Sequence, residues 1–331
     1  MFDLFLRARS YSELMLCAVC CVLATSSVVG AASFPAKSVR FVVPYPPGGN
    51  TDPVARAIAT KLSDAWGQQV VVDNRGGANT IIGAETVSKA TPDGYTLLLA
   101  TQATLSINPG VYRKLPYDAV RGFAPITGVV YYPQVMAAHP SVPANSIKEL
   151  ISLAKANPGK IMYTSSGNAS SGHLTGALLE SMAGIRMEHI GYRGTGPALF
   201  DLLAGRVQLL FTAMAAVQPH VAAGKLKVLG VCSERRLSAW PGIPTSLDAG
   251  LKGYESGVWF GIVTTAGTPP PVVEQLNRDI TRAVHAPEVT EKFLAQGYEI
   301  ITDTPSAFAA FIQKDRERIG RVAKAAGIRV E

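Results

Sequence analysis

Three segments of the sequence combine glycines with hydroxyl side chains, a composition suited to binding an anion. They read "PYPPGGNTD" at residues 44–52, "TSSGNASSGHL" at 164–174 and "GYRGTGPAL" at 191–199. Backbone N–H groups at the start of a helix lack intrahelical partners, and the helix dipole favours negative charge there. A single glycine pair such as Gly48 and Gly49 is equally typical of a tight turn. The three segments together predict a cleft that binds an anionic ligand.

Patterns typical of enzymes are absent from the sequence. The five histidines are scattered without the spacing of metal ligands. His173 lies close to Ser170, but "GNASSG" does not match the nucleophile motif G-x-S-x-G. "GYRGTG" is a poor dinucleotide fingerprint, and no Walker motif occurs. We therefore expect no catalytic residue, metal site or cofactor. The alternative is a two-lobed α/β enzyme, such as a transferase, that acts on an anionic substrate.

The elements that must position these segments alternate between strands and helices, a pattern typical of a parallel α/β sheet. A first unit is predicted from strands 39–43, 69–72 and 96–100 with helices 54–66 and 83–90. A second unit follows "VVYYP" at 129–133, with helices 146–157, 173–183 and 197–204 and strands 161–163, 187–190 and 207–211. Beyond an apolar run at 258–263, helices are predicted at 271–285, 288–295 and 304–326. In such sheets ligands lie beyond the carboxyl ends of the strands, where the three glycine segments lie.

The amino terminus resembles a secretory signal peptide over residues 1–32. Arg7 and Arg9 precede a mostly apolar stretch, and Gly30 and Ala32 occupy the −3 and −1 positions of a cleavage site. A membrane anchor is the alternative, since the stretch approaches the length of a membrane span. Removal of this segment leaves about 300 residues, a length that suits two lobes better than one core.

Charge and cysteine content narrow the partners further. The formal net charge is +7, but the basic residues are scattered rather than clustered with aromatic residues. This distribution argues against nucleic acid and favours an anionic small molecule or a membrane surface. Three of the four cysteines lie in the predicted signal peptide, so Cys232 has no intrachain disulfide partner. Its apolar neighbours in "LKVLGVCS" predict a buried strand residue.

Long motifs spread over the mature chain resemble the Bug family, the periplasmic solute-binding components of tripartite tricarboxylate transporters. They are, in order, "KSVRFVVPYPPGGNTDPVARAIATKL", "VVVDNRGGANTIIGAE", "PDGYTLLLAT", "YTSSGNASSGHLTGALL", "GYRGTGPALFDLLAGRVQLLF" and "WFGIVTTAGTPPPVVEQLN". The resemblance implies an α/β fold of the type II periplasmic binding proteins, with two doubly wound lobes, a hinge and a ligand cleft between them. Lobe 1 would comprise residues 34–135 and 257–331, and lobe 2 residues 136–256.

The resemblance also implies which residues contact the ligand. The matching positions are Tyr45, Gly48, Gly49, Thr51, Thr101 and Gln102 in the first lobe, and Ser165, Ser166, Asn168, Ser170, His173, Tyr192, Gly194, Thr195 and Thr212 in the second. Arg193, where a lysine or arginine is usual, is expected to point to solvent. "NRGGANT" replaces the more usual "NRPGAGG", and Thr212 stands where many members have an aspartate. The resulting hypothesis is a mono- or dicarboxylate ligand without an amino group.

The role implied by the resemblance is that of a receptor. The protein would reside in the periplasm as a monomer and pass its carboxylate to the membrane subunits of a tripartite tricarboxylate transporter, or to a sensor. Tyr131, Tyr132 and Trp259 lie where the chain is expected to cross between the lobes. Each of these aromatic side chains could line the cleft or belong to the core, and the sequence favours neither reading.

Overall fold

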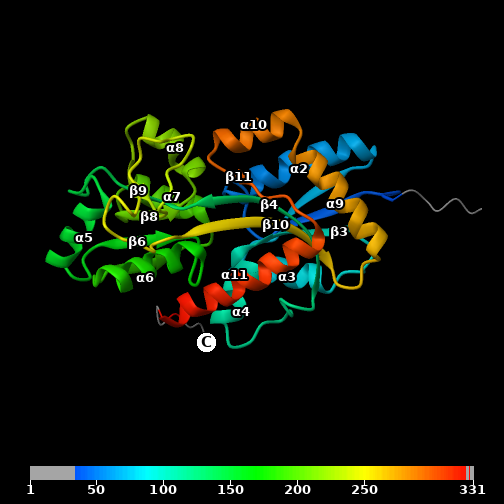
Figure 1. The fold of residues 1–331 in the computed structure, drawn as a ribbon, viewed down its shortest axis with the longest axis horizontal. Helices are drawn as coiled ribbons and strands as arrows, with labels where there is room; N and C mark the ends of the chain where they lie inside the picture. The colour runs from blue at the N-terminus through cyan, green and yellow to red at the C-terminus, as the bar shows by residue number, and fades with distance from the viewer. Residues whose placement is uncertain (1–33, 326–327, 329–331) are drawn as a thin grey trace, which may run out of the picture. The chain divides into compact units, whose positions relative to one another are not determined.

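Two β-sheets, each flanked by helices on both faces, make up the unit that spans residues 37–331 (Figure 1). The computed structural model describes residues 34–325 and 328, so the predicted signal peptide at 1–32 lies outside the described residues. No helix in that described part of the chain combines the length and apolarity needed to cross a membrane.

The first sheet has the strand order β11-β4-β10-β3-β1-β2. Strands β1 (Val39–Val43), β2 (Val70–Asn74) and β3 (Thr96–Thr101) are parallel, whereas β10 (Gly257–Thr265) runs antiparallel to both β3 and β4 (Phe123–Pro133). The short strand β11 (Glu299–Ile300) pairs with the outer edge of β4. The carboxyl ends of β1 and β3 therefore meet at one edge of this sheet.

Helices on the two faces of the first sheet are separate groups (Figure 1). One face carries α2 (Thr51–Trp66), α9 (Pro270–Val284) and α10 (Pro287–Ala295), which contact one another. The other face carries α3 (Ile81–Ser88), the π-helix η1 (Ala103–Ile107), α4 (Asn108–Val111) and α11 (Pro305–Ala325). The last helix begins where predicted, because Thr304 Oγ1 accepts a hydrogen bond from the Ala307 N–H at 3.3 Å.

The second sheet has the order β7-β6-β8-β5-β9. Its strands are β5 (Val135–Ala138), β6 (Met162–Ser165), β7 (Glu188–Gly191), β8 (Leu209–Thr212) and β9 (Lys227–Val231). Its helices are α5 (Ile147–Ala156), α6 (Ser171–Ala183), α7 (Thr195–Leu203) and α8 (Met214–Ala222). Side chains alternate along β5, with Met136 and Ala138 in the core beneath α5 and α6, and Val135 and Ala137 in the core beneath α7 and α8.

The two sheets are built on the same plan. Each has three parallel strands joined by helices and a fourth, antiparallel strand that arrives from the other sheet, β10 in the first and β5 in the second. The chain crosses at Gln134, between β4 and β5, and again just before β10, with the backbone N–H of Gln134 donating to the Ser256 carbonyl at 2.9 Å. The predicted two-lobed α/β class is confirmed.

Most predicted elements lie within a few residues of their expected positions, and the differences have physical reasons. The four residues of β5 follow β4 with only Gln134 between them, so no turn signal separates the two strands. Helix α8 was not predicted because it carries Pro219 and lacks a one-sided apolar pattern. Cys232 is buried as predicted but lies one residue beyond the end of β9.

Candidate ligand-binding cleft

A cavity of about 50 Å³ lies where loops of both sheets meet the crossing strands. The first sheet contributes residues 45–47 and 49–51, the second contributes Ser166, Ser171, Gly172, residues 194–197, Phe211 and Thr212, and the crossings contribute Tyr132, Gln134, Val258 and Phe260. None of these described lining residues is an aspartate, glutamate, lysine, arginine or histidine. The polar groups offered to a ligand are therefore hydroxyls, side-chain amides and the peptide backbone.

The N-termini of three helices converge on this cavity. Helices α2, α6 and α7 begin at Thr51, Ser171 and Thr195, all of which line it. Neither Asn50 nor Gly194 caps its helix with a side-chain hydrogen bond. The first-turn N–H groups of α2 and α7 consequently remain available to a ligand, and both helix dipoles favour an anion at this place.

The glycine pair that precedes α2 serves both of the roles considered for it. Gly48 has φ of +83°, a left-handed conformation that side chains rarely adopt, so it forms the turn. Gly49 lines the cavity, and a Cβ added there would meet no protein atom within 4 Å. The space beside Gly49 is therefore open to a ligand.

Asp52, in the first turn of α2, is occupied by neighbouring groups. Its carboxylate accepts hydrogen bonds from Arg56 Nε at 2.9 Å and from Asn74 Nδ2 at 3.0 Å. Burial alone would raise the pKa of Asp52, but these bonds and one from the Gly48 backbone hold the pKa below its ordinary value. The charge of Asp52 is thus stabilised within the first lobe and is not directed at the cavity.

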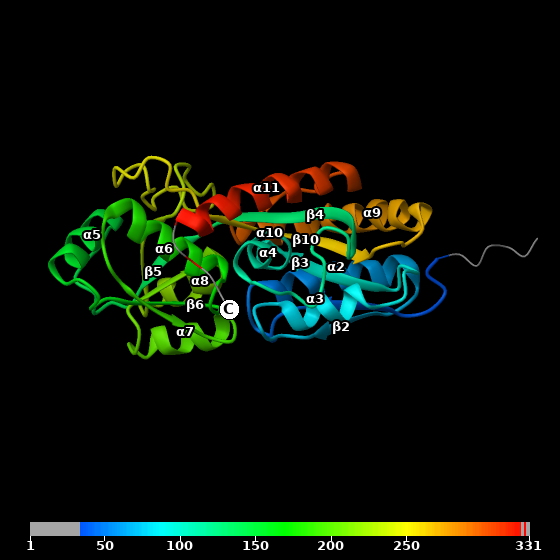
Figure 2. The ribbon, with the colours of Figure 1, turned by 90° about the horizontal axis from the view of Figure 1, so that it is seen from below.

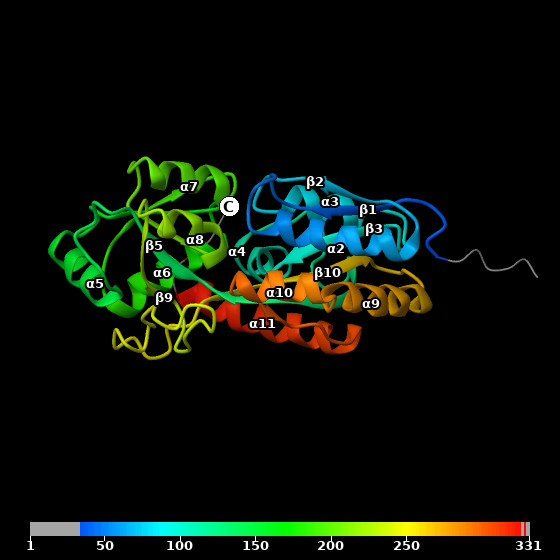
Figure 3. The same ribbon diagram turned by 90° about the horizontal axis from the view of Figure 1, so that it is seen from above.

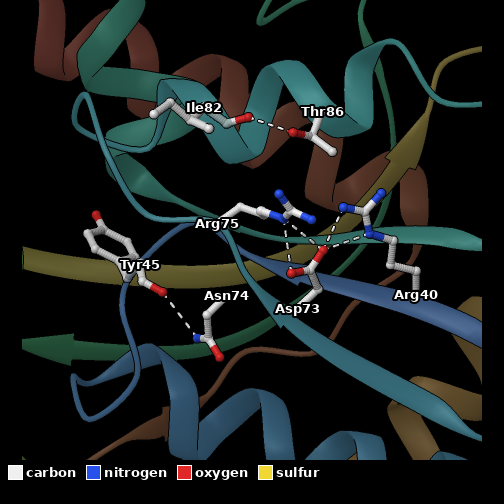
Figure 4. A network of polar contacts seen from close by, with 7 residues as sticks. All are labelled: Arg40, Tyr45, Asp73, Asn74, Arg75, Ile82 and Thr86. Carbon is white, nitrogen blue, oxygen red and sulfur yellow. Dashed lines mark hydrogen bonds and ion pairs between the residues drawn. The ribbon is translucent and has the colours of Figure 1, made fainter.

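A hydrogen-bond network behind the first loop fixes its path (Figure 4). Asn74 Nδ2 donates to the Tyr45 carbonyl at 3.1 Å, and Asp73 accepts from Arg40 Nε at 2.8 Å and from Arg75 Nε at 3.0 Å. These contacts tie the loop after β1 to the end of β2. The charged residues behind the uncharged cavity wall therefore pair with one another, and Asn74 fixes the position of the Tyr45 backbone.

Two hydrogen bonds join the lobes across the cleft. Asn50 Nδ2 donates to Thr212 Oγ1 at 3.2 Å, and Asn79 Nδ2 donates to the Ala169 carbonyl at 3.1 Å. Asn79 belongs to the loop in which the sequence departs from "NRPGAGG", and Ala78, Asn79 and Thr80 all have positive φ. The two lobes are therefore in direct contact in this structure, and the unusual loop contributes one of the hydrogen bonds between them.

The structure brings seven of the residues predicted to bind ligand to the cavity wall, namely Tyr45, Gly49, Thr51, Ser166, Gly194, Thr195 and Thr212. Three others, Gly48, Asn168 and Tyr192, line grooves that adjoin the cavity. Burial raises the pKa of Tyr45 to about 12, against a smaller opposing effect of its hydrogen bond with Thr101. Tyr45 therefore presents a neutral phenol near the cleft.

The remaining predicted residues lie outside the wall of the cavity and make internal contacts. Gln102 Nε2 donates to Asp315 Oδ1 at 3.3 Å, and the hydroxyl of Thr101 lies 3.3 Å from that of Thr104. Ser170 Oγ accepts from the His173 N–H at 3.4 Å and thereby caps α6. These side chains therefore make hydrogen bonds within the protein, beside the cavity, instead of facing into it.

His173 is directed away from the cavity and towards a second histidine. Its Nδ1 accepts from the Ala169 N–H at 3.0 Å, and its ring stacks on His189 with 3.8 Å between ring centroids. Burial lowers the pKa of His173 to about 4, and burial followed by the proximity of His173 lowers that of His189 to about 3. Both rings are neutral near pH 7, and the fully buried Ser165, 2.7 Å from His189 Nε2, does not line the cavity.

Several cavity residues were not predicted from the sequence. Asn50, Gln134, Phe211, Val258 and Phe260 line the wall, and three of them, Gln134, Val258 and Phe260, lie at the crossings between the lobes. The proximity of the aromatic pair Tyr131 and Tyr132 to this crossing was the available signal. Tyr132 does line the cavity.

Trp259 belongs to the core rather than to the cleft. Its side chain is 1% exposed, and its Nε1 donates to Asp315 Oδ2 at 2.8 Å. No group of three or more His, Cys, Asp or Glu side chains able to hold a metal occurs within residues 34–325 and 328.

Comparison with known families identifies this arrangement. Residues 54–328 match the family model described as the tripartite tricarboxylate transporter family receptor. The chain belongs to this family. The predicted Bug-type identity is confirmed, because Protein BugT of Bordetella pertussis is 34% identical over 304 residues, which cover 92% of this chain and 93% of the relative. A protein from the tcbD–tcbE intergenic region of Pseudomonas sp. strain P51 is 38% identical over 291 residues, covering 86% and 85% of the two chains.

Solved structures agree with the family assignment. Rpa4515 of R. palustris, determined with adipate, has a TM-score of 0.87 and 34% identity, covering 89% of this chain and 99% of its own. The periplasmic binding protein BugD has a TM-score of 0.85 and 34% identity, covering 90% of this chain and 100% of its own. These relatives are solute-binding receptors. The chain is therefore a solute-binding receptor, and the transferase alternative is set aside.

Proposed function

We propose that this receptor binds a small organic mono- or dicarboxylate without an amino group. The observation that carries the proposal is the cavity at the uncapped N-termini of α2 and α7, whose described wall has no charged side chain. Neutral N–H and hydroxyl donors favour a carboxylate at such a place. Each hydrogen bond to the bound anion would contribute on the order of 1.5–3 kcal/mol.

The same wall disfavours an ammonium group. A buried ammonium needs a carboxylate or several acceptors, because an unpaired buried charge is strongly destabilising. Thr212 offers only a hydroxyl, and the nearby Asp52 is already paired with Arg56. Support for a carboxylate also comes from relatives, since Rpa4515 was determined with adipate and MatC of Rhodopseudomonas palustris, 28% identical, with malate.

In the proposed physiology, residues 1–32 are a leader that is removed on export to the periplasm. The mature protein acts as a monomer, with lobe 1 formed by residues 34–135 and 257–331 and lobe 2 by residues 136–256. It delivers its ligand to the membrane subunits of a tripartite tricarboxylate transporter or to a sensor. The division into lobes is supported by the two sheets and by the crossings at Gln134 and Ser256.

Thermal melting of the purified mature protein against a ligand panel tests the chemistry. The panel contains succinate, adipate, citrate and aromatic acids on one side, and aspartate and glutamate on the other. A ligand at about 100 times its dissociation constant adds roughly 2.7 kcal/mol, which raises the melting temperature by several degrees. We expect at least one acid without an amino group to do so. A shift with aspartate or glutamate alone would refute the proposed ligand class.

A further inference from the structure

A groove lies beside the cavity, and the described residues of its wall include a single cationic side chain. The groove has a volume of about 230 Å³ and shares Tyr45, Pro46, Ser166 and Gly194 with the inner cavity. Beyond these four residues its wall includes Arg193, and among the described residues that line it there is no aspartate or glutamate. The residues shared by the two hollows therefore lie between the inner cavity and a positive charge.

Arg193 differs from other arginines near the cleft because its charge is not paired. Arg75 forms an ion pair with Asp73, with 3.0 Å between the charged atoms, and Arg206 forms one with Asp201 at 2.8 Å. In the part of the chain that the structure describes, the exposed Arg193 side chain has no hydrogen bond or ion pair. Its guanidinium is therefore free to bind an anion.

The neighbouring carboxylate does not neutralise this cation. Asp201 lies on helix α7, which begins two residues after Arg193, and accepts hydrogen bonds from the Tyr192 hydroxyl and from Arg206 Nη1. Both hydrogen bonds lower the pKa of Asp201, and the bond from the Tyr192 hydroxyl has the larger effect. Asp201 thus has its own partners, and the positive charge of Arg193 faces the groove uncompensated.

The size of the inner cavity makes the groove relevant to ligand choice. The inner cavity, at about 50 Å³, is smaller than the Arg193 groove, at about 230 Å³. Two larger hollows share lining residues with the inner cavity, the Arg193 groove and a second groove of about 290 Å³. The second groove adjoins Gly49 and Thr195, and the described residues of its wall include no lysine or arginine.

We infer that the Arg193 groove is a subsite for the second carboxylate of an α,ω-dicarboxylate. This inference rests on the proposed carboxylate-binding function and extends it to a substrate class. One carboxylate lies at the N-termini of α2 and α7, the methylene chain passes Tyr45 and Ser166, and the Arg193 guanidinium holds the distal carboxylate. A guanidinium offers parallel N–H donors that match a carboxylate in geometry and charge.

Calorimetric titration with matched pairs of acids tests this subsite. Succinate, adipate and suberate are compared with butyrate, hexanoate and octanoate, which keep the chain length but lack the second carboxylate. We expect one dicarboxylate to bind wild-type protein about tenfold or more tightly than its matched monocarboxylate. Arg193→Gln should remove that preference while leaving monocarboxylate affinity within about twofold. The preference should also weaken as sodium chloride is raised, because the guanidinium is exposed.

Arg206→Gln is the matched control. Arg193 precedes α7 and Arg206 follows it, but the charge of Arg206 is paired with Asp201. It should leave both affinities unchanged. Equal binding of both members of every pair, or an unchanged preference in Arg193→Gln, overturns the subsite while the carboxylate receptor stands. Absence of binding by all six acids and by the wider melting panel overturns the proposed function together with the subsite.

Discussion

Replacing Thr212 by aspartate would place a negative charge in the wall of the inner cavity. Thr212 is 4% exposed, and its hydroxyl accepts a hydrogen bond from Asn50 Nδ2 at 3.2 Å. The described lining residues include no cation that could pair with the introduced carboxylate. The bound acid and the new charge would therefore repel each other in a poorly solvated space.

The size of this effect follows from Coulomb's law. Two like charges about 5 Å apart, with an effective dielectric constant of about 20, repel by about 3 kcal/mol. That energy corresponds to a loss of affinity of more than about a hundredfold. Thr212→Asn is the matched control, since it has nearly the shape of the aspartate without its charge, and it should retain affinity within about tenfold of wild type.

Calorimetric titration of both variants with the tightest-binding acid measures the difference, after melting curves have shown that both variants fold. Burial and the charge of the ligand raise the pKa of the introduced carboxylate, so it becomes protonated more readily in the complex. Affinity of the aspartate variant should therefore recover as the pH falls from about 7 to about 5. Equal affinity of the aspartate and asparagine variants at pH 7 would refute the placement of the anion beside Thr212.

Other predictions concern closure, the aromatic wall and pH. The radius of gyration from solution scattering should decrease on saturation with ligand, because the binding groups are divided between the lobes, and an unchanged profile would argue against closure. Tyr132→Phe should keep the ring contact with Phe260, whose centroid lies 5.5 Å away, so a wild-type melting temperature with about tenfold weaker binding would identify the hydroxyl as a ligand contact. The pKa values of His173 and His189, about 4 and about 3, lie below the unfolded value of about 6.5, so their contribution to stability is complete above about pH 6.5 and is lost progressively as the pH falls towards 3. His189→Gln should flatten the fall of the melting temperature across this range, and an unaltered pH profile would contradict the assignment.

The alternation of apolar runs and amphipathic segments was sufficient to predict most of both sheets. A strand buried on both faces, such as β3 at Thr96–Thr101, appears as a nearly continuous apolar run, here Leu97 to Ala100. The pattern does not reveal which strands pair, because pairing joins residues far apart in sequence. The insertion of β10 between β3 and β4 was therefore not predicted, whereas the return of the carboxy-terminal segment to the first lobe came from the family resemblance.

The loops of the binding site were predictable because glycines and hydroxyl residues mark them locally. Gly49, Ser166 and Thr195 belong to such loops and line the cavity. Gln134 and Phe260 also line it, but Gln134 lies between β4 and β5 and Phe260 lies on β10, where nothing in the local sequence distinguishes a cavity residue from a core residue. The orientation of a side chain within a correctly predicted loop was likewise not accessible, as the stacking of His173 on His189 shows.

The loops beside the Arg193 groove come from both lobes. Helix α7 of the second lobe and helix α3 of the first lie on the same side of the molecule, opposite β4 and α11 (Figures 2 and 3). The groove beside Arg193 is lined by the loops that precede these two helices, residues 77–80 and 191–194. Opening of the lobes about the crossing strands would therefore separate these loops and expose the inner cavity.

A crystal structure of the mature protein with its tightest-binding acid tests the central claim most directly. We predict that one carboxylate of the ligand lies in the inner cavity, within hydrogen-bond distance of first-turn N–H groups of α2 or α7, directly or through one water. The N–H groups concerned are those of Thr51, Thr195 and Gly196. A ligand carboxylate bound elsewhere, or held in that cavity by a charged side chain instead of the helix N-termini, would contradict the account.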